Sequence, residues 1–219
     1  MDYRIIPVTP FQQNCTLLRC QVTNATAIVD PGGEPERILA ALATMQAEPA
    51  MILLTHGHMD HVGAAPALAA RLGVPILGPH ADDAFWLDAL PQQAQMFGFP
   101  PQEPFRPERF LRAGETLALG ERRIDVLHCP GHTPGHIVFF DEEARLAQVG
   151  DVLFAGGIGR TDFPRGNHRD LLHAIRERLF PLGDDVHFVP GHGPMSTFGE
   201  ERRSNPFLQA GREGLGARG

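Results

Sequence analysis

Three histidines and one aspartate lie within the six residues that end at His61. They read His-Gly-His-Met-Asp-His and follow Thr55 and the apolar run 51–54. Neutral imidazole nitrogens and carboxylate oxygens suit zinc or a similar first-row divalent ion. His56 and His58 are two residues apart, so on extended backbone their side chains point the same way. The run therefore predicts a metal site.

Three further ligand candidates each follow a predicted strand that ends in a glycine turn. His132 lies in a Pro-Gly-His-Thr-Pro-Gly-His sequence after the β-like run 124–128. Asp151 comes directly after a glycine, and His192 lies in Pro-Gly-His-Gly after the run 186–189. Open α/β sheets place their sites at the carboxyl ends of strands, where glycine lets the backbone approach closely. We therefore expect all the candidates to converge on one site.

The seven candidates divide into two groups of three with one residue between them. We expect one ion on His56, His58 and His132 and a second on Asp60, His61 and His192, with Asp151 bridging. A structural zinc site is closed by four protein ligands, commonly cysteines, whereas a catalytic site keeps an open position. Because no candidate is a cysteine, the set favours catalysis, with Asp60 and Asp151 as its catalytic carboxylates.

The chemistry expected of such a site is hydrolysis. Two ions about 3.5 to 4 Å apart share a water whose pKa falls toward about 7, which makes hydroxide at neutral pH. This metal-bridging hydroxide is the nucleophile, and one ion polarises the substrate carbonyl. Thioesters suit the site because a thiolate leaves without protonation, and a lactone would be attacked in the same way.

Charge and composition narrow the class of partner. The formal net charge of -7 and the pI near 5.8 disfavour a nucleic-acid surface, which needs a basic face. A small-molecule substrate is expected instead, and phosphodiester cleavage is disfavoured. Cys15, Cys20 and Cys129 show no zinc or disulfide spacing. With no signal-like or membrane-spanning apolar run, we expect a cytoplasmic protein without membrane contact, and the oligomeric state stays open.

Segments of strand and helix periodicity alternate along the chain, which predicts an α/β fold of two packed sheets between outer helices. We expect one domain over residues 1–219, with helices at about 35–45, 62–72 and 167–179. The stretch 86–112, rich in proline and phenylalanine, is the hardest to assign. Its aromatics from Phe97 to Phe105 either line a pocket mouth or are buried. Strands are expected at 3–8, 16–20, 26–30, 51–55, 74–77 and near Leu117, Ile124, Ile137, Leu146 and Val186.

The ordered motifs T-H-x-H-x-D-H, P-G-H-T-P-G-H, G-D and P-G-H-G resemble those of the metallo-β-lactamase superfamily, over nearly the whole chain. Val-Asp-Pro-Gly-Gly at 29–33, the run 159–166 and Asn-Pro-Phe at 205–207 are similar to short bacterial glyoxalase II-like hydrolases of the YcbL type. The resemblance implies a metallo-β-lactamase fold, an αββα sandwich of two mixed sheets. It also implies hydroxyacylglutathione hydrolase activity, which converts S-D-lactoylglutathione and water to D-lactate and glutathione. Zinc is the default metal, with iron or manganese as alternatives.

Only the family resemblance indicates how the substrate is recognised. It implies that Arg160, in a Gly-x-Gly-Arg turn after the bridging aspartate, contacts a glutathione carboxylate. Fewer than thirty residues follow His192 in this sequence, so we expect the fold to lack the carboxy-terminal helical domain of full-length glyoxalase II. The tyrosine that the longer enzymes place after the last metal histidine is also missing, because Tyr3 is the only tyrosine.

Other functions stay open at this point. A persulfide dioxygenase shares the Gly-Arg-Thr-Asp-Phe run at 159–163, but it uses one iron on two histidines and an aspartate, and it carries Pro-Ala-His-Asp where this chain has Pro-Gly-His-Gly. A lactonase or a non-catalytic metal-binding scaffold are further alternatives. His136 either orients the His132 loop or is a packing residue.

Overall fold

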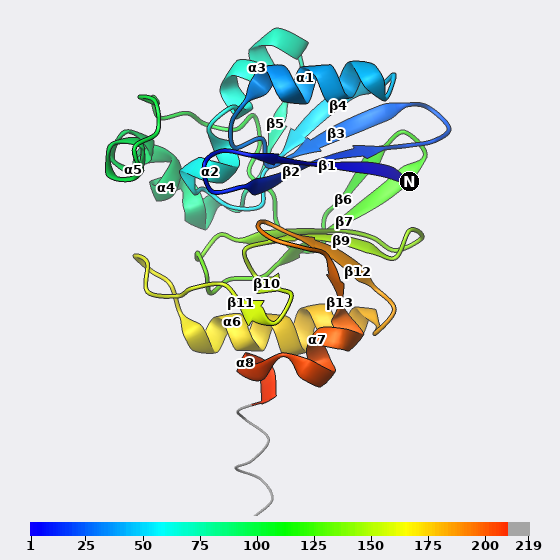
Figure 1. The fold of residues 1–219 in the computed structure, drawn as a ribbon, viewed down its shortest axis with the longest axis vertical. Coiled ribbons are helices and arrows are strands. Elements are labelled where there is room, and N and C mark those ends of the chain that lie inside the picture. Colours follow the sequence, from blue (N-terminus) through cyan, green and yellow to red (C-terminus); the bar gives the residue numbers. More distant parts are fainter. Residues whose placement is uncertain (210–219) are drawn as a thin grey trace, which may run out of the picture.

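Two β-sheets face each other in the computed structural model, which describes residues 1–209 (Figure 1). The strand order is β1-β2-β3-β4-β5 in the first sheet and β13-β12-β9-β8-β7-β6 in the second. Helices lie on the outer face of each sheet, so the layers run helix, sheet, sheet, helix. Both sheets contain parallel and antiparallel pairs. The expected αββα sandwich of two mixed sheets is therefore confirmed.

The first sheet is built from the amino-terminal part of the chain. Its strands are β1 (Asp2–Val8), β2 (Gln13–Arg19), β3 (Ala25–Val29), β4 (Glu48–Leu53) and β5 (Ile76–Leu77). Its outer face carries α1 (Pro35–Thr44) and α3 (Ala65–Leu72), and α2 (Met59–Val62) follows the histidine-rich run. The helix expected from about Val62 to Leu72 is confirmed over Ala65–Leu72, but it begins three residues later than expected, because a turn at Gly63 and Ala64 separates it from α2 and Pro66 lies in its first turn.

The second sheet is built from the carboxy-terminal part. Its strands are β6 (Thr116–Leu119), β7 (Arg122–His128), β8 (Ile137–Asp141), β9 (Leu146–Gly150), β12 (His187–Pro190) and β13 (Ser196–Thr197). A separate hairpin joins β10 (Leu153–Phe154) to β11 (Gly157–Ile158). Below the sheet lie α6 (His168–Ala174), which continues into a π-helical turn (Ile175–Leu179), α7 (Phe198–Ser204) and α8 (Pro206–Gln209).

Apolar side chains fill three layers between these elements. Strand periodicity divides the residues of one strand between two layers, since successive side chains point to opposite faces. At β4, Ile52 packs toward α1 and α3 with Ile38 and Leu68, whereas Leu53 packs between the sheets against residues such as Ile137. The third layer lies between the second sheet and its helices. This packing holds the two sheets in a fixed relation.

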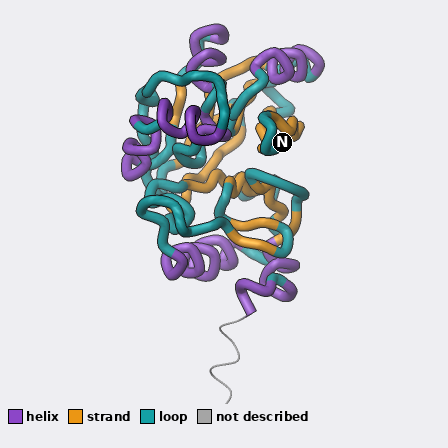
Figure 2. The backbone as a smooth tube through the Cα atoms, turned by 60° about the vertical axis from the view of Figure 1, so that its left-hand side comes forward, coloured by secondary structure: helices purple, strands orange, loops and turns teal. Residues whose placement is uncertain are grey.

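The stretch that was hard to assign forms two short helices and an extended segment. These are α4 (Ala84–Asp88) and α5 (Leu90–Phe97), after which residues 98–115 run without a strand or helix, apart from a bridge between Leu77 and Arg109. Figure 2, in which the left side of Figure 1 comes forward, shows loops gathered between the two helical layers. Among residues 1–209, no helix has the length and apolar character needed to cross a membrane.

Candidate metal centre

The structure brings all seven candidate ligands together at the edge where the two sheets meet. His56 and His58 follow β4, and Asp60 and His61 lie in α2. The others come from loops that follow three strands of the second sheet, with His132 after β7, Asp151 after β9 and His192 after β12. The convergence expected from strand ends is therefore what the fold produces.

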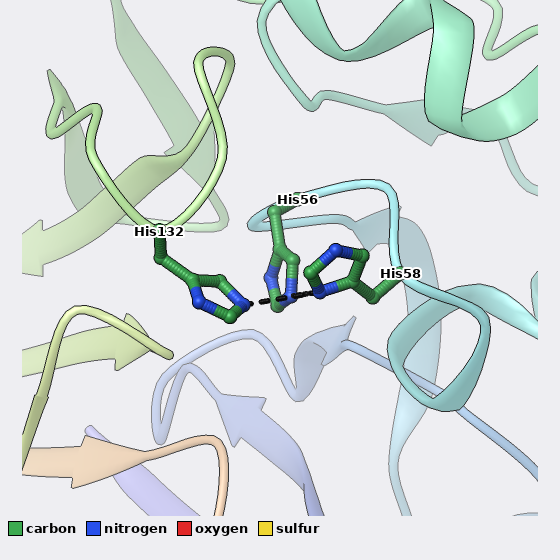
Figure 3. A group of neighbouring side chains, drawn as sticks. All are labelled: His56, His58 and His132. Carbon is green, nitrogen blue, oxygen red and sulfur yellow. Dashed lines mark hydrogen bonds between the residues drawn. The ribbon is translucent and has the colours of Figure 1, made fainter. Parts of the chain in front are cut away.

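The first group consists of His56, His58 and His132, whose ring nitrogens point at one another (Figure 3). His58 Nδ1 lies 3.1 Å from His56 Nε2 and 3.0 Å from His132 Nε2. Zinc–nitrogen bonds of about 2.0 to 2.1 Å at tetrahedral angles separate two ligand nitrogens by about 3.3 Å. The three rings therefore fit an ion of zinc size with little movement.

The second group consists of Asp60, His61 and His192. Asp60 Oδ2 lies 3.1 Å from His192 Nε2 and 3.8 Å from His61 Nε2. Asp151 lies between the groups, with Oδ1 3.4 Å from His61 Nε2 and Oδ2 3.5 Å from His132 Nε2. Oδ2 also lies 3.8 Å from His192 Nε2. The Asp151 carboxylate therefore faces residues of both groups, as a bridging carboxylate would.

Backbone carbonyls set the tautomers of two of these histidines. His132 Nδ1 donates to the carbonyl of Arg160 at 2.7 Å, and His192 Nδ1 donates to the carbonyl of Phe11 at 3.1 Å. A carbonyl can only accept, so each Nδ1 carries the proton and each Nε2 presents its lone pair to the site. Hydrogen bonds of this kind on the outer nitrogen are the usual support of a metal-binding histidine.

Asp30 sets the tautomers of two more. Its carboxylate accepts hydrogen bonds from His61 Nδ1 at 2.9 Å and from the backbone N–H and hydroxyl of Thr55 at 2.7 and 2.6 Å. The Thr55 hydroxyl has thus donated its proton, so at 3.0 Å it accepts from His56 Nδ1. His56 and His61 therefore also direct Nε2 inward. Asp30 is not among the site residues predicted from the sequence.

The charges of the site suit cations. Burial lowers the pKa of His56, His58 and His132 below the usual histidine value, so these rings stay neutral and keep their lone pairs. Against burial, Asp151 and Asp60 raise the pKa of His61, and the positive charge of that ring outweighs burial and holds the pKa of Asp151 far below its usual value. A bound metal cation would take the place of the His61 Nε2 proton. Within residues 1–209, the buried His61 Nε2 and Asp151 Oδ1 make no hydrogen bond. A cation between the groups would satisfy both atoms.

A buried carboxylate outside the site joins the two loops of the first group. Asp83, in a one-turn helix (Ala81–Asp83), accepts from the Gly57 N–H at 2.9 Å and from the Gly135 N–H at 2.6 Å. It also accepts from the Thr133 hydroxyl at 2.8 Å. Gly57 lies between two candidate ligands, and Thr133 directly follows His132. Asp83 therefore holds the loops of the first group in register.

A corresponding contact holds the loop of the second group. The side-chain amide of Asn14, in β2, donates to the carbonyls of Pro190 at 3.0 Å and Gly193 at 2.8 Å. The backbone N–H of Asn14 donates to the carbonyl of Gly191 at 2.7 Å. A strand of the first sheet is therefore hydrogen-bonded directly to the His192 loop, which follows a strand of the second sheet.

Two further features answer questions left by the sequence. His136 Nε2 accepts the backbone N–H of Asp151 at 3.0 Å, so this ring holds the backbone at Asp151 and makes more than a packing contact. A Cβ on Gly191 would come within 2.0 Å of Asp151 Oδ1 and 2.6 Å of the His61 ring. Only glycine lets this backbone pass so close, as expected for the glycines beside the ligands.

A pocket of about 710 Å³ opens above the two groups. Its floor includes Asp60 and Asp151, and its walls are largely apolar and aromatic. Arg160 lines it with an exposed guanidinium that makes two 2.7 Å hydrogen bonds to Asp162 and lies 4.2 Å from the centre of the Phe163 ring. The pocket is of a size that suits a small-molecule substrate. Phe97 and Phe99, two of the unassigned aromatics, are among the residues that line it.

Comparison with known proteins places this geometry in a family. Residues 8–192 match the family described as the metallo-beta-lactamase superfamily. The chain is 51% identical to the hydroxyacylglutathione hydrolase GloC of Haemophilus influenzae, over 96% of this chain and 99% of that protein. It is 36% identical to the probable metallo-hydrolase YqgX of Bacillus subtilis, over 95% and 98% of the two chains.

Solved structures agree with these relatives. The crystal structure of the BLEG-1 B3 metallo-beta-lactamase superposes with a TM-score of 0.88 at 34% identity, over 94% of this chain and 99% of that chain. TTHA1623, in a di-iron-bound form, superposes with a TM-score of 0.85 at 37% identity, over 94% and 100%. The fold, the histidine and aspartate groups and these relatives lead to one assignment. The chain belongs to the metallo-β-lactamase superfamily and is a metal-binding hydrolase.

Proposed function

We propose that the protein hydrolyses glutathione thioesters, with S-D-lactoylglutathione as substrate and D-lactate and glutathione as products. The observation that carries the proposal is the pair of ligand groups, joined by Asp151, at the floor of an apolar pocket that Arg160 lines. The relative that is 51% identical is named for this reaction. Three buried free thiols suit a reducing cytoplasm, where we place the reaction.

The residues fit two divalent ions, which we take to be zinc. One ion would be held by His56, His58 and His132. The other would be held by Asp60, His61 and His192, and Asp151 would contact both ions. When bound, the two ions supply hydroxide at neutral pH and polarise the thioester carbonyl. The new C–O bond replaces the C–S bond, and the thiolate leaves without a proton.

The chain's own residues position these groups. The hydrogen bonds that fix Nδ1 as the protonated nitrogen of His56, His61, His132 and His192 prevent each ring from turning its lone pair away. The apolar walls keep bulk water from the reacting carbonyl. The Arg160 guanidinium can bind a glutathione carboxylate by a two-point hydrogen bond once it separates from Asp162.

Parallel assays on zinc-loaded and on iron-loaded protein test the proposal, because the rival oxidation needs a redox-active metal. S-D-lactoylglutathione should be hydrolysed without oxygen, and a chelator should abolish the activity. A simple lactone should be a poorer substrate, because an alkoxide leaves less readily than a thiolate. Oxygen-dependent oxidation of glutathione persulfide, without thioester cleavage, would instead identify a persulfide dioxygenase.

A further inference from the structure

The pocket has two chemically different sides. The Arg160 guanidinium lies over the Phe163 ring. The centre of that ring lies 5.0 Å from the centre of the His58 ring and 6.1 Å from the centre of the His132 ring, so it is next to the first ligand group. Apart from the candidate metal ligands, Arg160 is the only charged side chain among the described residues that line the pocket. This side can receive a charged part of the substrate.

The side next to His192 is aromatic and uncharged. The Phe11 carbonyl accepts the hydrogen bond from His192, and the Phe154 ring lies 6.4 Å from the His192 ring. Phe11 makes edge-to-face contacts with Phe97 at 6.1 Å and with Phe99 at 5.4 Å. These four phenylalanines come from the β1–β2 turn, the end of α5 and β10, and we call them the aromatic wall.

The aromatic wall has apolar surface that is still open. Phe11 is 45% exposed and Phe97 40% exposed, although both line the pocket that holds Asp60, Asp151 and His192. A thioester carbonyl placed over the metal ligands sends its two substituents in different directions. The charged thiol half belongs with Arg160, so the acyl half lies against the aromatic wall. A lactoyl group can place only one methyl against the aromatic wall, so most of the apolar surface of the wall would stay exposed to water.

We infer that the aromatic wall is an acyl-binding subsite that selects 2-hydroxyacyl thioesters with a bulky apolar or aromatic substituent over lactoyl thioesters. The inference rests on the proposed thioester hydrolysis and assigns its substrate class. Covering half-exposed aromatic rings with a phenyl group removes apolar surface from water on both partners. A phenyl group in place of the methyl should therefore raise kcat/KM about tenfold to a hundredfold.

The test compares S-D-mandeloylglutathione with S-D-lactoylglutathione, which share the thiol and the 2-hydroxyl and differ by phenyl against methyl. Each kcat/KM is divided by the rate of hydrolysis in hydroxide alone, which removes intrinsic reactivity. Phe97→Ser and Phe11→Ser alter the aromatic wall from two separate elements. Phe207→Ser is the matched control, because Phe207 in α8 is 52% exposed and lies outside the pocket lining.

The normalised mandeloyl-to-lactoyl ratio should be about ten or more in the unaltered protein. It should fall at least threefold in each wall variant and stay unchanged in Phe207→Ser. A ratio near one, or a ratio that neither wall variant changes, would overturn the subsite. If the wall variants instead abolish a dimer and leave the ratio intact, the aromatic wall is a self-association surface and the inference is wrong. Hydrolysis of neither thioester by protein with two metal equivalents would reject the proposed function itself.

Discussion

At the residue scale, the ligating atom of a histidine depends on what its other nitrogen contacts. Four candidate ligands have Nδ1 occupied by a carbonyl, a hydroxyl or a carboxylate, and all four therefore present Nε2. His58 is the exception, because its Nδ1 faces His56 and His132. The mixed use of nitrogens lets two histidines only two residues apart share one ion.

Asp151→Asn should be among the most damaging single substitutions. The neutral amide has one oxygen acceptor and no charge, so it cannot bridge two cations. Loss of a mere supporting contact at a metal site costs about tenfold to a hundredfold, so kcat/KM for S-D-lactoylglutathione should fall at least a hundredfold. The matched control is Asp185→Asn, because Asp185 is an exposed ion-pair partner of Arg145. Near-normal hydrolysis by Asp151→Asn would remove the bridging role.

Arg160→Ala should raise KM for S-D-lactoylglutathione about fivefold to tenfold, the low end for a charge-assisted hydrogen bond. The effect is modest because the guanidinium is exposed and already pairs with Asp162. Metal content should not change, since His132 bonds only the backbone carbonyl of Arg160. Asp162→Asn frees the guanidinium and should lower KM. Equal losses on a thioester that lacks the tripeptide would show that Arg160 supports the loop instead.

At the element scale, two contacts hold the ligand-bearing loops. Asp83 joins the loops of the first group, and Asn14 of β2 holds the loop of His192. Asp83→Asn should therefore weaken the first ion about tenfold to a hundredfold, and Asn14→Ala should weaken the second to a similar extent. Titration of metal-free variants with Co²⁺, followed by absorbance, resolves the two ions. Equal weakening of both ions in both variants would contradict separate roles.

Asp83 also predicts how stability depends on pH. Burial raises the pKa of its carboxyl to about 6, and hydrogen bonds from Thr133, Gly57 and Gly135 only partly offset this. Below about pH 4, Asp83 is protonated in both the folded and the unfolded metal-free protein, so its burial does not lower the free energy of unfolding. As pH rises through 6, keeping the charge buried costs about 3 kcal/mol of the free energy of unfolding.

The Asp83→Asn variant has no titratable side chain at this position. Its free energy of unfolding is therefore the reference against which the cost of the buried Asp83 charge is measured. The free energy of unfolding of the unaltered metal-free protein, minus that of the variant, should fall by about 2 kcal/mol between pH 4 and pH 7. Urea unfolding of both proteins at matched pH values measures the difference. A difference that is constant with pH, or that rises, would show that Asp83 is ionised without cost.

At the scale of the whole molecule, the ligands come from both sheets, so bound ions connect the two halves of the sandwich. Metal-replete protein should contain close to two metal equivalents. Ligand at about a hundredfold excess over its Kd stabilises the folded state by about 2.7 kcal/mol. For a protein of this size, removal of the ions by a chelator should lower Tm by roughly 5 to 10 °C. A ceiling of one ion under replete conditions would reject the second group as a metal site.

The sequence by itself determined the fold class and the candidate ligand set. The ligands lie in short motifs at strand ends, and the alternation of apolar residues along each strand is a local property that survives in the sheet. The start of the helix expected at 62–72 was misplaced because apolar periodicity alone could not show the turn at Gly63 that separates α2 from α3. Helix boundaries of this kind depend on neighbouring elements.

Only the tertiary structure decided what surrounds those ligands. Asp83 contacts residues 26 and 52 positions away, and Asn14 contacts a loop 176 positions away, so no local pattern marks either side chain. The aromatic wall likewise assembles from a turn, a helix end and a hairpin. Ligand type is a property of the residue, whereas hydrogen-bond partners and pocket walls depend on which distant segments pack together, and packing is determined by the whole chain.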